Sequence, residues 1–153
     1  MTIMNFDIHQ GSFSISTDHE KLNFDFIHDY LCNQSYWAQG RSREVVEKSI
    51  RNSLCFGVFD EEQQVGFARI VSDYITFAWL CDVFIAESHR GQGLGKWLVK
   101  SVISHPEVES VKNILLATSN AHEFYRKYGG FKALQGFDKW MVRHLETKSE
   151  EQT

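Results

Sequence analysis

The chain has 153 residues, of which 42% are hydrophobic and 24% charged, with a formal net charge of −4 at pH 7. This length suits one domain with its own core, and the acidic balance argues against a nucleic-acid-binding surface. No apolar run approaches the ~20 residues of a membrane-spanning helix, and no charged-then-apolar leader is present. We therefore expect one cytoplasmic domain over residues 1–153, with residues 146–153 as a frayed tail and neither nucleic-acid nor membrane partners.

Cysteine and histidine usage gives no sign of a metal site. The three cysteines, Cys32, Cys55 and Cys81, are an odd number and lie in apolar runs, which is typical of reduced core thiols. The seven histidines show no metal-ligand spacing. We therefore expect no metal.

The first third of the chain predicts a strand followed by two helices. FSIST (13–17) alternates apolar and polar residues, as a short strand does. Asp18 is placed to cap a helix whose apolar residues recur at helical spacing over 22–31. A loop over 33–40 then leads to Ser42, a predicted cap for the second helix.

The middle of the chain predicts three strands. The runs LCFGVF (54–59) and QVGFARIV (64–71) flank the acidic turn DEEQ, which indicates a hairpin. A further strand is predicted over 76–85.

The last third predicts two more helices among strands. A helix is expected over 94–104, and the apolar run 111–118 indicates a strand buried on both faces. A second helix, over 121–130, ends at a glycine pair. FKAL (131–134) and KWMVRHL (139–145) are candidate closing strands. The order of elements predicts a single mixed α/β domain.

The glycine-rich stretch HRGQGLGK (89–96) lies between a predicted strand and a predicted helix. A bare turn that opens a helix presents backbone N–H groups and the positive end of the helix dipole, and this geometry binds phosphate. Side chains at the three glycines would hold a pyrophosphate away from those amides. The flanking Arg90 and Lys96 can add positive charge.

Two common phosphate motifs fail on spacing. A P-loop needs Ser or Thr after its lysine, whereas Trp97 follows Lys96. A dinucleotide fingerprint needs a glycine three residues after Gly93, where this chain has Lys96.

The spacing Arg90-x-x-Gly93-x-Gly95 resembles the signature of the GNAT superfamily of N-acetyltransferases, whose loop holds the pyrophosphate of acetyl-CoA. Residues 82–98 resemble that family's strand–loop–helix core. HEFYRKYGGF (122–131) resembles its later tyrosine-containing helix and Gly-Phe stop. The resemblance implies the acyl-CoA N-acyltransferase fold, with a mainly antiparallel central sheet flanked by helices, and acetyl transfer from acetyl-CoA to a primary amine.

The chain departs from the family pattern in two places. Thr118 stands where many relatives have asparagine, and the stop Gly129-Gly130-Phe131 has one glycine more than usual. Neither departure touches the glycine-rich loop.

The resemblance implies that Tyr125 is the general acid that protonates the leaving thiolate, although a core aromatic residue is the simpler alternative. It implies that Asp82 handles the substrate amine, directly or through water. An alkyl ammonium with a pKa of about 10.4 is almost wholly charged at pH 7, so a carboxylate that attracts it and accepts its proton is useful. Strand alternation predicts that Asp82 shares a face with Leu80 and Phe84, and a structural cap bonded to local amides is the alternative role.

The resemblance also implies a set of coenzyme-binding residues. The end of the strand before the loop is expected to splay from its neighbour and pair with the pantetheine arm through its backbone. The implied set is Val83, Phe84, Ile85, Arg90, Gly91, Gln92, Gly93, Leu94, Gly95, Lys96, Thr118 and Tyr125.

The acceptor is expected to meet Trp37, Tyr74 and Asp82, and aromatic residues make up 14% of the chain. Aromatic content and acidic charge favour a small cationic amine over a nucleic acid or a large basic partner. Three alternatives stay open: a protein or peptide N-acetyltransferase, a non-catalytic CoA-binding sensor, and, for assembly, a homodimer.

Overall fold

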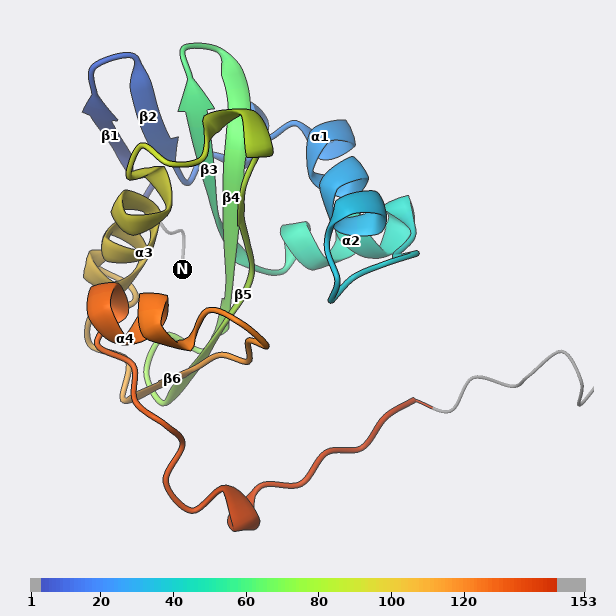
Figure 1. Cartoon of the computed structure of the whole chain (residues 1–153), viewed down its shortest axis with the longest axis vertical. Helices are drawn as coiled ribbons and strands as arrows, with labels where there is room; N and C mark the ends of the chain where they lie inside the picture. The colour runs from blue at the N-terminus through green and yellow to red at the C-terminus, as the bar shows by residue number, and fades with distance from the viewer. Residues whose placement is uncertain (1–3, 146–153) are drawn as a thin grey trace, which may run out of the picture.

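The computed structural model describes residues 4–145, so the predicted tail over 146–153 lies outside the described residues. One six-stranded sheet runs through the molecule in chain order, and its strands are antiparallel except for the last pair, which is parallel (Figure 1). The strands are β1 (Asp7–Gln10), β2 (Phe13–Ser16), β3 (Leu54–Asp60), β4 (Gln63–Ser72), β5 (Phe77–Ile85) and β6 (Asn113–Leu115). This confirms the predicted mixed, mainly antiparallel sheet flanked by helices.

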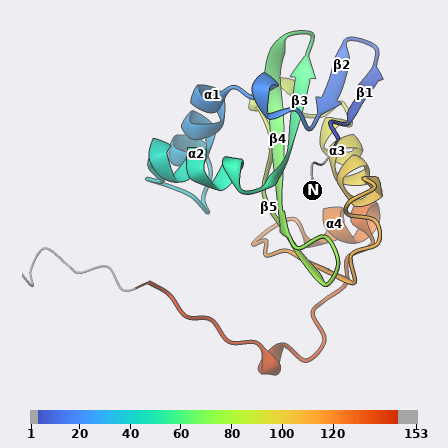
Figure 2. The same cartoon turned by 180° about the vertical axis from the view of Figure 1, so that it is seen from behind.

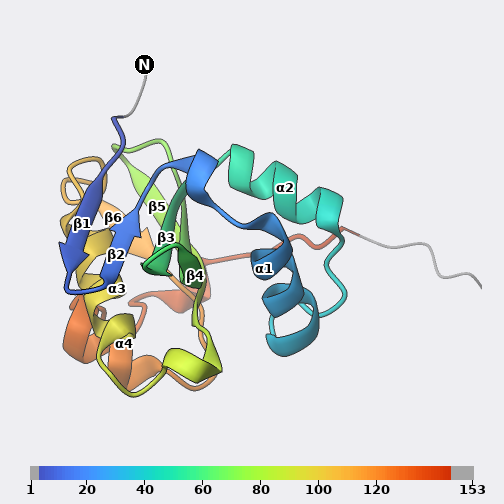
Figure 3. The same ribbon diagram turned by 90° about the horizontal axis from the view of Figure 1, so that it is seen from above.

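Four α-helices cover the two faces of this sheet. They are α1 (Phe24–Asp29), α2 (Arg43–Arg51), α3 (Leu94–Ser104) and α4 (His122–Gly129). In Figures 1 and 3, α1 and α2 lie on one face, while α3 and α4 lie on the other. Each face has its own apolar cluster, with Leu98 and Val102 of α3 in one, and Ile27 and Val46 of α1 and α2 in the other. None of the helices in the described range is long and apolar enough to span a bilayer.

Side-chain caps set the starts of the first two helices. The Ser42 hydroxyl accepts a hydrogen bond from Val45 N at 3.2 Å, so its predicted role is confirmed. Asp18 instead caps a single 3₁₀ turn, and the cap of α1 is Asn23, which accepts from Phe26 N. The predicted helix over 22–31 therefore begins later, because the Asn23 side chain competes for the backbone there.

The C-terminal part departs most from the prediction. The expected strand over 111–118 is reduced to β6, an edge strand that is not buried on both faces. The closing strands predicted over 131–134 and 139–145 are wrong, because this segment has no sheet neighbour to pair with and contains only a 3₁₀ turn over Phe137–Lys139. Figures 1 and 2 show it leaving the sheet as an extended stretch.

The divergence of β5 from β6 positions the candidate site. The two strands pair only from Phe77 to Trp79 on β5, opposite the whole of β6. Beyond Trp79 the second half of β5 keeps its hydrogen bonds to β4 but has no strand on its other side. The backbone that leads to the glycine-rich turn therefore has no neighbouring strand along one edge, as the family resemblance implied.

Candidate active site

A β-bulge redirects the second half of β5. Asp82 has a φ of 53°, and Asp82 and Val83 together oppose Ala68 of β4. The extra residue changes the alternation, so Leu80 packs in the cluster under α3, whereas Phe84 packs with α1 and α2. The predicted common face of Leu80, Asp82 and Phe84 is therefore wrong, because alternation assumes an unbroken ladder.

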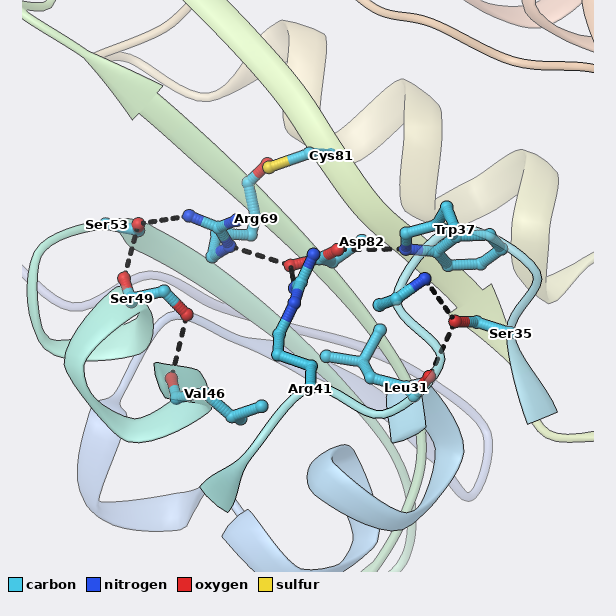
Figure 4. A network of polar contacts seen from close by, with 11 residues as sticks. Leu31, Ser35, Trp37, Arg41, Val46, Ser49, Ser53, Arg69, Cys81 and Asp82 are labelled. Atoms are coloured by element: carbon cyan, nitrogen blue, oxygen red, sulfur yellow. Dashed lines mark hydrogen bonds and ion pairs between the residues drawn. The ribbon is translucent and has the colours of Figure 1, made fainter. Parts of the chain in front are cut away.

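Asp82 is the centre of a buried polar network (Figure 4). Its Oδ2 atom accepts from Arg69 Nε and from Arg41 Nη1, both at 2.9 Å, and its Oδ1 atom accepts from Trp37 Nε1 at 2.9 Å. Arg69 donates a further bond to the Ser53 hydroxyl. Three elements thus meet on one carboxylate, namely β4, β5 and the connection between α1 and α2. The alternative of a cap on local amides is not what holds Asp82.

A pocket of about 460 Å³ opens beside this network, where β5 and β6 diverge. Residues from the α1–α2 connection, β5 and the segment before α4 line it, among them Tyr36, Trp37, Arg41, Asp82, Thr118 and Tyr125. The structure thus brings together the predicted Trp37, Asp82, Thr118 and Tyr125.

Tyr74, by contrast, does not line this pocket. It lies in the turn between β4 and β5, with a φ of 65°, and its backbone N–H donates to the Ser72 hydroxyl. Its ring borders a different hollow, next to His19 and Leu54. The expectation that Tyr74 meets the acceptor is therefore corrected, because the tight turn directs this residue toward the start of β3.

Tyr125 stands on the first turns of α4 with its ring against Phe124 and Phe131. Burial raises the pKa of its phenol to about 12, with a smaller contribution from Tyr36. The hydroxyl therefore keeps its proton throughout the neutral range, as a proton donor must.

Tyr36 closes the pocket from the opposite side, and sequence reasoning did not assign it this place. Its hydroxyl accepts a hydrogen bond from Ser119 N at 3.0 Å, which joins the α1–α2 connection to the loop before α4. Hydrogen bonds from Ser119 and Thr118 lower the pKa of Tyr36. The Thr118 hydroxyl also accepts from Ala121 N, so Thr118 shapes the turn that leads into α4.

The glycine-rich turn is bare, as predicted. Gly91 and Gly93 have φ values of 82° and 85°, a conformation that favours glycine, and a Cβ added at either would meet no protein atom within 4 Å. Gly93 is the N-cap of α3, and no side chain caps that helix. The N–H groups of the first turn of α3 therefore have no side-chain cap. These features fit a diphosphate held by main-chain amides.

The charged neighbours of the turn point elsewhere. Arg90 Nε donates to the Ile85 carbonyl at 2.9 Å, and Arg90 Nη2 donates to the Tyr30 hydroxyl at 2.7 Å. Lys96 places its ammonium 5.2 Å from the centre of the Tyr128 ring. Arg90 thus braces the end of β5 against α1 rather than standing at the edge of the turn.

Within the turn itself, the Gln92 side chain donates to the His89 carbonyl, and Leu94 is buried in the α3 cluster. Gly95 faces Phe124 and Ile85, and a Cβ added there would lie 3.5 Å from the Phe124 ring, at an ordinary contact distance. The Phe84 ring stacks on Tyr30 with centroids 3.8 Å apart. The side chains of Phe84 and Ile85 are buried in the core, so only their backbone is left to meet a ligand, whereas Val83 is partly buried and lines the pocket.

Cys81 also lines the pocket but is not a nucleophile. Burial raises the pKa of its thiol, and that of Cys55, to about 12. Both sulfurs therefore remain protonated at neutral pH, and the thiolate is the nucleophilic form.

We expect Asp82→Asn to destabilise the fold strongly. The substitution keeps the shape of the side chain but leaves the charges of Arg69 and Arg41 unbalanced, and the Asp82 side chain is only 2% exposed. Breaking a buried ion pair in this way costs ~3–5 kcal/mol, to be measured by urea unfolding. Asp25→Asn is the matched control, because Asp25 pairs with Arg43 at the surface with 82% of its side chain exposed. Equal losses of unfolding free energy in the two variants would contradict a stabilising role for the network around Asp82.

The diverging pair of strands, the bare turn at the start of α3 and the adjoining pocket together define the class of acyl-CoA N-acyltransferases. A family model described as an acetyltransferase (GNAT) domain matches residues 51–132. The chain belongs to the GNAT family of acetyltransferases.

Individual relatives agree with this assignment. A solved structure of a GNAT-family acetyltransferase-type protein from Xanthomonas campestris pv. campestris is 40% identical, with a TM-score of 0.84 over 87% of this chain and 93% of that one. An acetyltransferase-type protein of Gibberella zeae is 28% identical over 156 residues, which cover 82% of this chain and 87% of the relative. A GNAT-family structure from Elizabethkingia anophelis, 16% identical with a TM-score of 0.59 over 78% of this chain and 76% of that one, holds acetyl-CoA.

Some site residues could have been found from the sequence. Arg69 is the one charged residue in the apolar strand QVGFARIV, and a buried acid such as Asp82 needs a cationic partner, so these two could have been paired. Arg41 and Tyr36 lie in a loop without periodicity, and nothing local assigns them to the pocket.

Proposed function

We propose that this protein transfers the acetyl group of acetyl-CoA to a primary amine of a small molecule, in the pocket between Trp37, Asp82 and Tyr125. One observation carries the proposal: the free edge of β5 runs from the bare turn of α3 to the pocket that Tyr125 lines. A single extended ligand can therefore contact the turn with one end and the pocket with the other. Membership of the GNAT family supports the reaction class.

The residues present fit acetyl-CoA. In this proposal the amides around Gly91 and Gly93 hold its diphosphate, and the backbone of Val83 to Ile85 pairs with its pantetheine arm. The coenzyme supplies an acyl thioester, which is activated for attack by an amine. A backbone N–H at the end of β5 polarises the thioester carbonyl.

Tyr125 handles the leaving group. The amine nitrogen forms a bond to the acyl carbon, the carbon–sulfur bond breaks, and the Tyr125 hydroxyl gives its proton to the sulfur. Burial raises the pKa of the Tyr125 phenol to about 12, so the hydroxyl holds the proton that the developing thiolate needs. Solvent then returns a proton to Tyr125.

Asp82 acts in this proposal as a positioning residue. Its two oxygens already accept three hydrogen bonds, so it holds Trp37 and Arg41 at the pocket wall. The proton that the attacking amine must lose passes to water in the open pocket. Asp82 therefore acts on the amine indirectly, because it holds Trp37 and Arg41 in place while water takes the proton.

The experiment is a thiol-release assay with acetyl-CoA and a panel of primary amines, combined with calorimetry for coenzyme binding. Amine-dependent release of CoA supports the proposal. Tight coenzyme binding without turnover on any amine would indicate a non-catalytic sensor. Acetylation confined to peptides or proteins, detected by mass spectrometry of treated cell extract, would indicate a protein acetyltransferase. Absence of coenzyme binding would overturn the proposal altogether.

A further inference from the structure

We infer that the acceptor amine also carries a carboxylate, and that Arg41 is the residue that binds this carboxylate. The inference rests on the proposed function and names the class of its acceptor. It starts from the balance of charge around Asp82.

The charge of Asp82 is already balanced by Arg69. Arg69 Nε lies 2.9 Å from Asp82 Oδ2, its side chain is 9% exposed, and its Nη1 is bonded to the Ser53 hydroxyl. Arg69 thus has two of its three guanidinium nitrogens bonded within the protein, and it is not among the residues that line the pocket. The Arg69–Asp82 pair is neutral and structural.

Because Asp82 is paired with Arg69, the positive charge of Arg41 is left without an acid of its own to balance it. Within residues 4–145 its side chain makes one hydrogen bond, from Nη1 to the same oxygen of Asp82. Its side chain is 23% exposed and lines the pocket. A guanidinium has five N–H donors, so most of those on Arg41 remain for a ligand, in the planar arrangement that suits a carboxylate.

No other acid offsets this charge at the pocket wall. Among the described residues that line the pocket, Asp82 is the single acidic residue, and the others apart from Arg41 are uncharged at neutral pH. Counted together with Arg69, which pairs with Asp82 behind the wall, the cluster of Arg41, Arg69 and Asp82 has two positive charges and one negative charge, so it is positive although the whole chain has a net charge of −4. The overall composition favours a small cationic acceptor. The positive charge beside this pocket would repel such a molecule.

A positive wall also serves the chemistry of an amine. A like charge nearby disfavours the ammonium form and so lowers the pKa of the bound amine, which increases the fraction that can attack. An acceptor that also has a carboxylate gains attraction to Arg41 through that group. Free α-amino acids are the simplest compounds that have both groups.

The test compares α-amino acids with their carboxamides, which keep the side chain but lose the negative charge; because the amide also has a less basic amine, each kcat/KM is expressed per concentration of free amine. Matched pairs of alanine, leucine, phenylalanine and glutamine are assayed for kcat/KM with acetyl-CoA. Loss of a hydrogen bond to a charged group corresponds to a preference of about 10- to 100-fold for the acid. If no acid is acetylated faster than its amide, the inference is wrong.

Variants assign the preference to the guanidinium. Arg41→Gln should reduce the acid-to-amide ratio toward 1, while Arg41→Lys should retain part of it. Arg43→Gln is the control, because Arg43 pairs with Asp25 and Glu47 outside the pocket, and its ratio should stay that of the native protein. An unchanged ratio in Arg41→Gln would overturn the role of Arg41. Circular dichroism checks that each variant is folded.

A binding measurement separates this inference from the proposed function. Coenzyme affinity and turnover on the amides report on acetyl transfer alone. Equal turnover on acids and amides would contradict the carboxylate-binding role of Arg41 but would still support acetyl transfer. Absence of coenzyme binding would contradict both the inference and the proposed function. For the CoA-bound protein, a thermal shift with 3-phenylpropionate that exceeds the shift with 3-phenylpropanamide supports the subsite without any turnover, and equal shifts contradict it.

Discussion

Gly93→Val should abolish measurable binding of acetyl-CoA while the domain remains folded. Gly93 has a φ of 85°, where a β-branched side chain is strained, and its added carbons would project into the open space in front of the α3 amides. The substitution therefore both distorts the turn and occupies the place proposed for the diphosphate. Calorimetry with acetyl-CoA measures the loss, and circular dichroism establishes the fold.

Gly11→Val is the control that separates the effect of backbone strain from the loss of coenzyme binding. Gly11 lies in the turn between β1 and β2 with a φ of 60°, and an added Cβ there also meets no protein atom within 4 Å. Both variants should lose a similar ~1–2 kcal/mol of stability, because left-handed backbone is disfavoured for side chains with a Cβ. Only Gly93→Val should lose the coenzyme. Retained binding in that variant would contradict the assignment of the turn.

Tyr125→Phe should lower kcat by about 10²-fold with little change in coenzyme affinity. The phenylalanine keeps the ring packing against Phe124 and Phe131 but removes the hydroxyl that we propose protonates the sulfur. Tyr128→Phe, on the same helix, is the control, because its ring lies beside Lys96 and outside the pocket. An undiminished kcat in Tyr125→Phe would remove Tyr125 from the mechanism.

The pH dependence of kcat gives a second test of the role of the Tyr125 phenol. The acid form of Tyr125 is the active one, and burial raises its pKa to about 12, so raising the pH deprotonates this phenol only near that value. The native kcat should therefore show no alkaline fall attributable to Tyr125 below about pH 11. A loss of kcat centred near pH 10 that is absent from Tyr125→Phe would show an unperturbed phenol instead.

Local signals predicted the parts of the site that local chemistry determines. The three closely spaced glycines indicated the bare turn, and the apolar spacing after them predicted α3 over its full length, Leu94–Ser104. The hairpin of β3 and β4 followed from two apolar runs around an acidic turn. These features depend on backbone freedom and periodicity, which a sequence displays directly.

The remaining features depend on contacts between distant residues. The bulge at Asp82 has no local sign, because aspartate carries no requirement for a positive φ. The pairing of Asp82 with Arg41 joins residues 41 positions apart, and strand alternation could not place it. The segment 139–145 alternates like a strand, but no neighbouring strand is in place to pair with it. Periodicity thus predicts which conformation a segment suits, whereas the sheet decides whether it is adopted.

The β-bulge has a thermodynamic consequence for a two-substrate reaction. Residue 82 holds the acceptor side of the site through Arg41, and the next three residues supply the backbone edge proposed for the coenzyme. An acceptor that shifts Arg41 would therefore act, through a single peptide unit, on the edge proposed for the pantetheine arm. By linkage, whatever factor the acceptor imposes on the affinity of the coenzyme, the coenzyme must impose on the affinity of the acceptor.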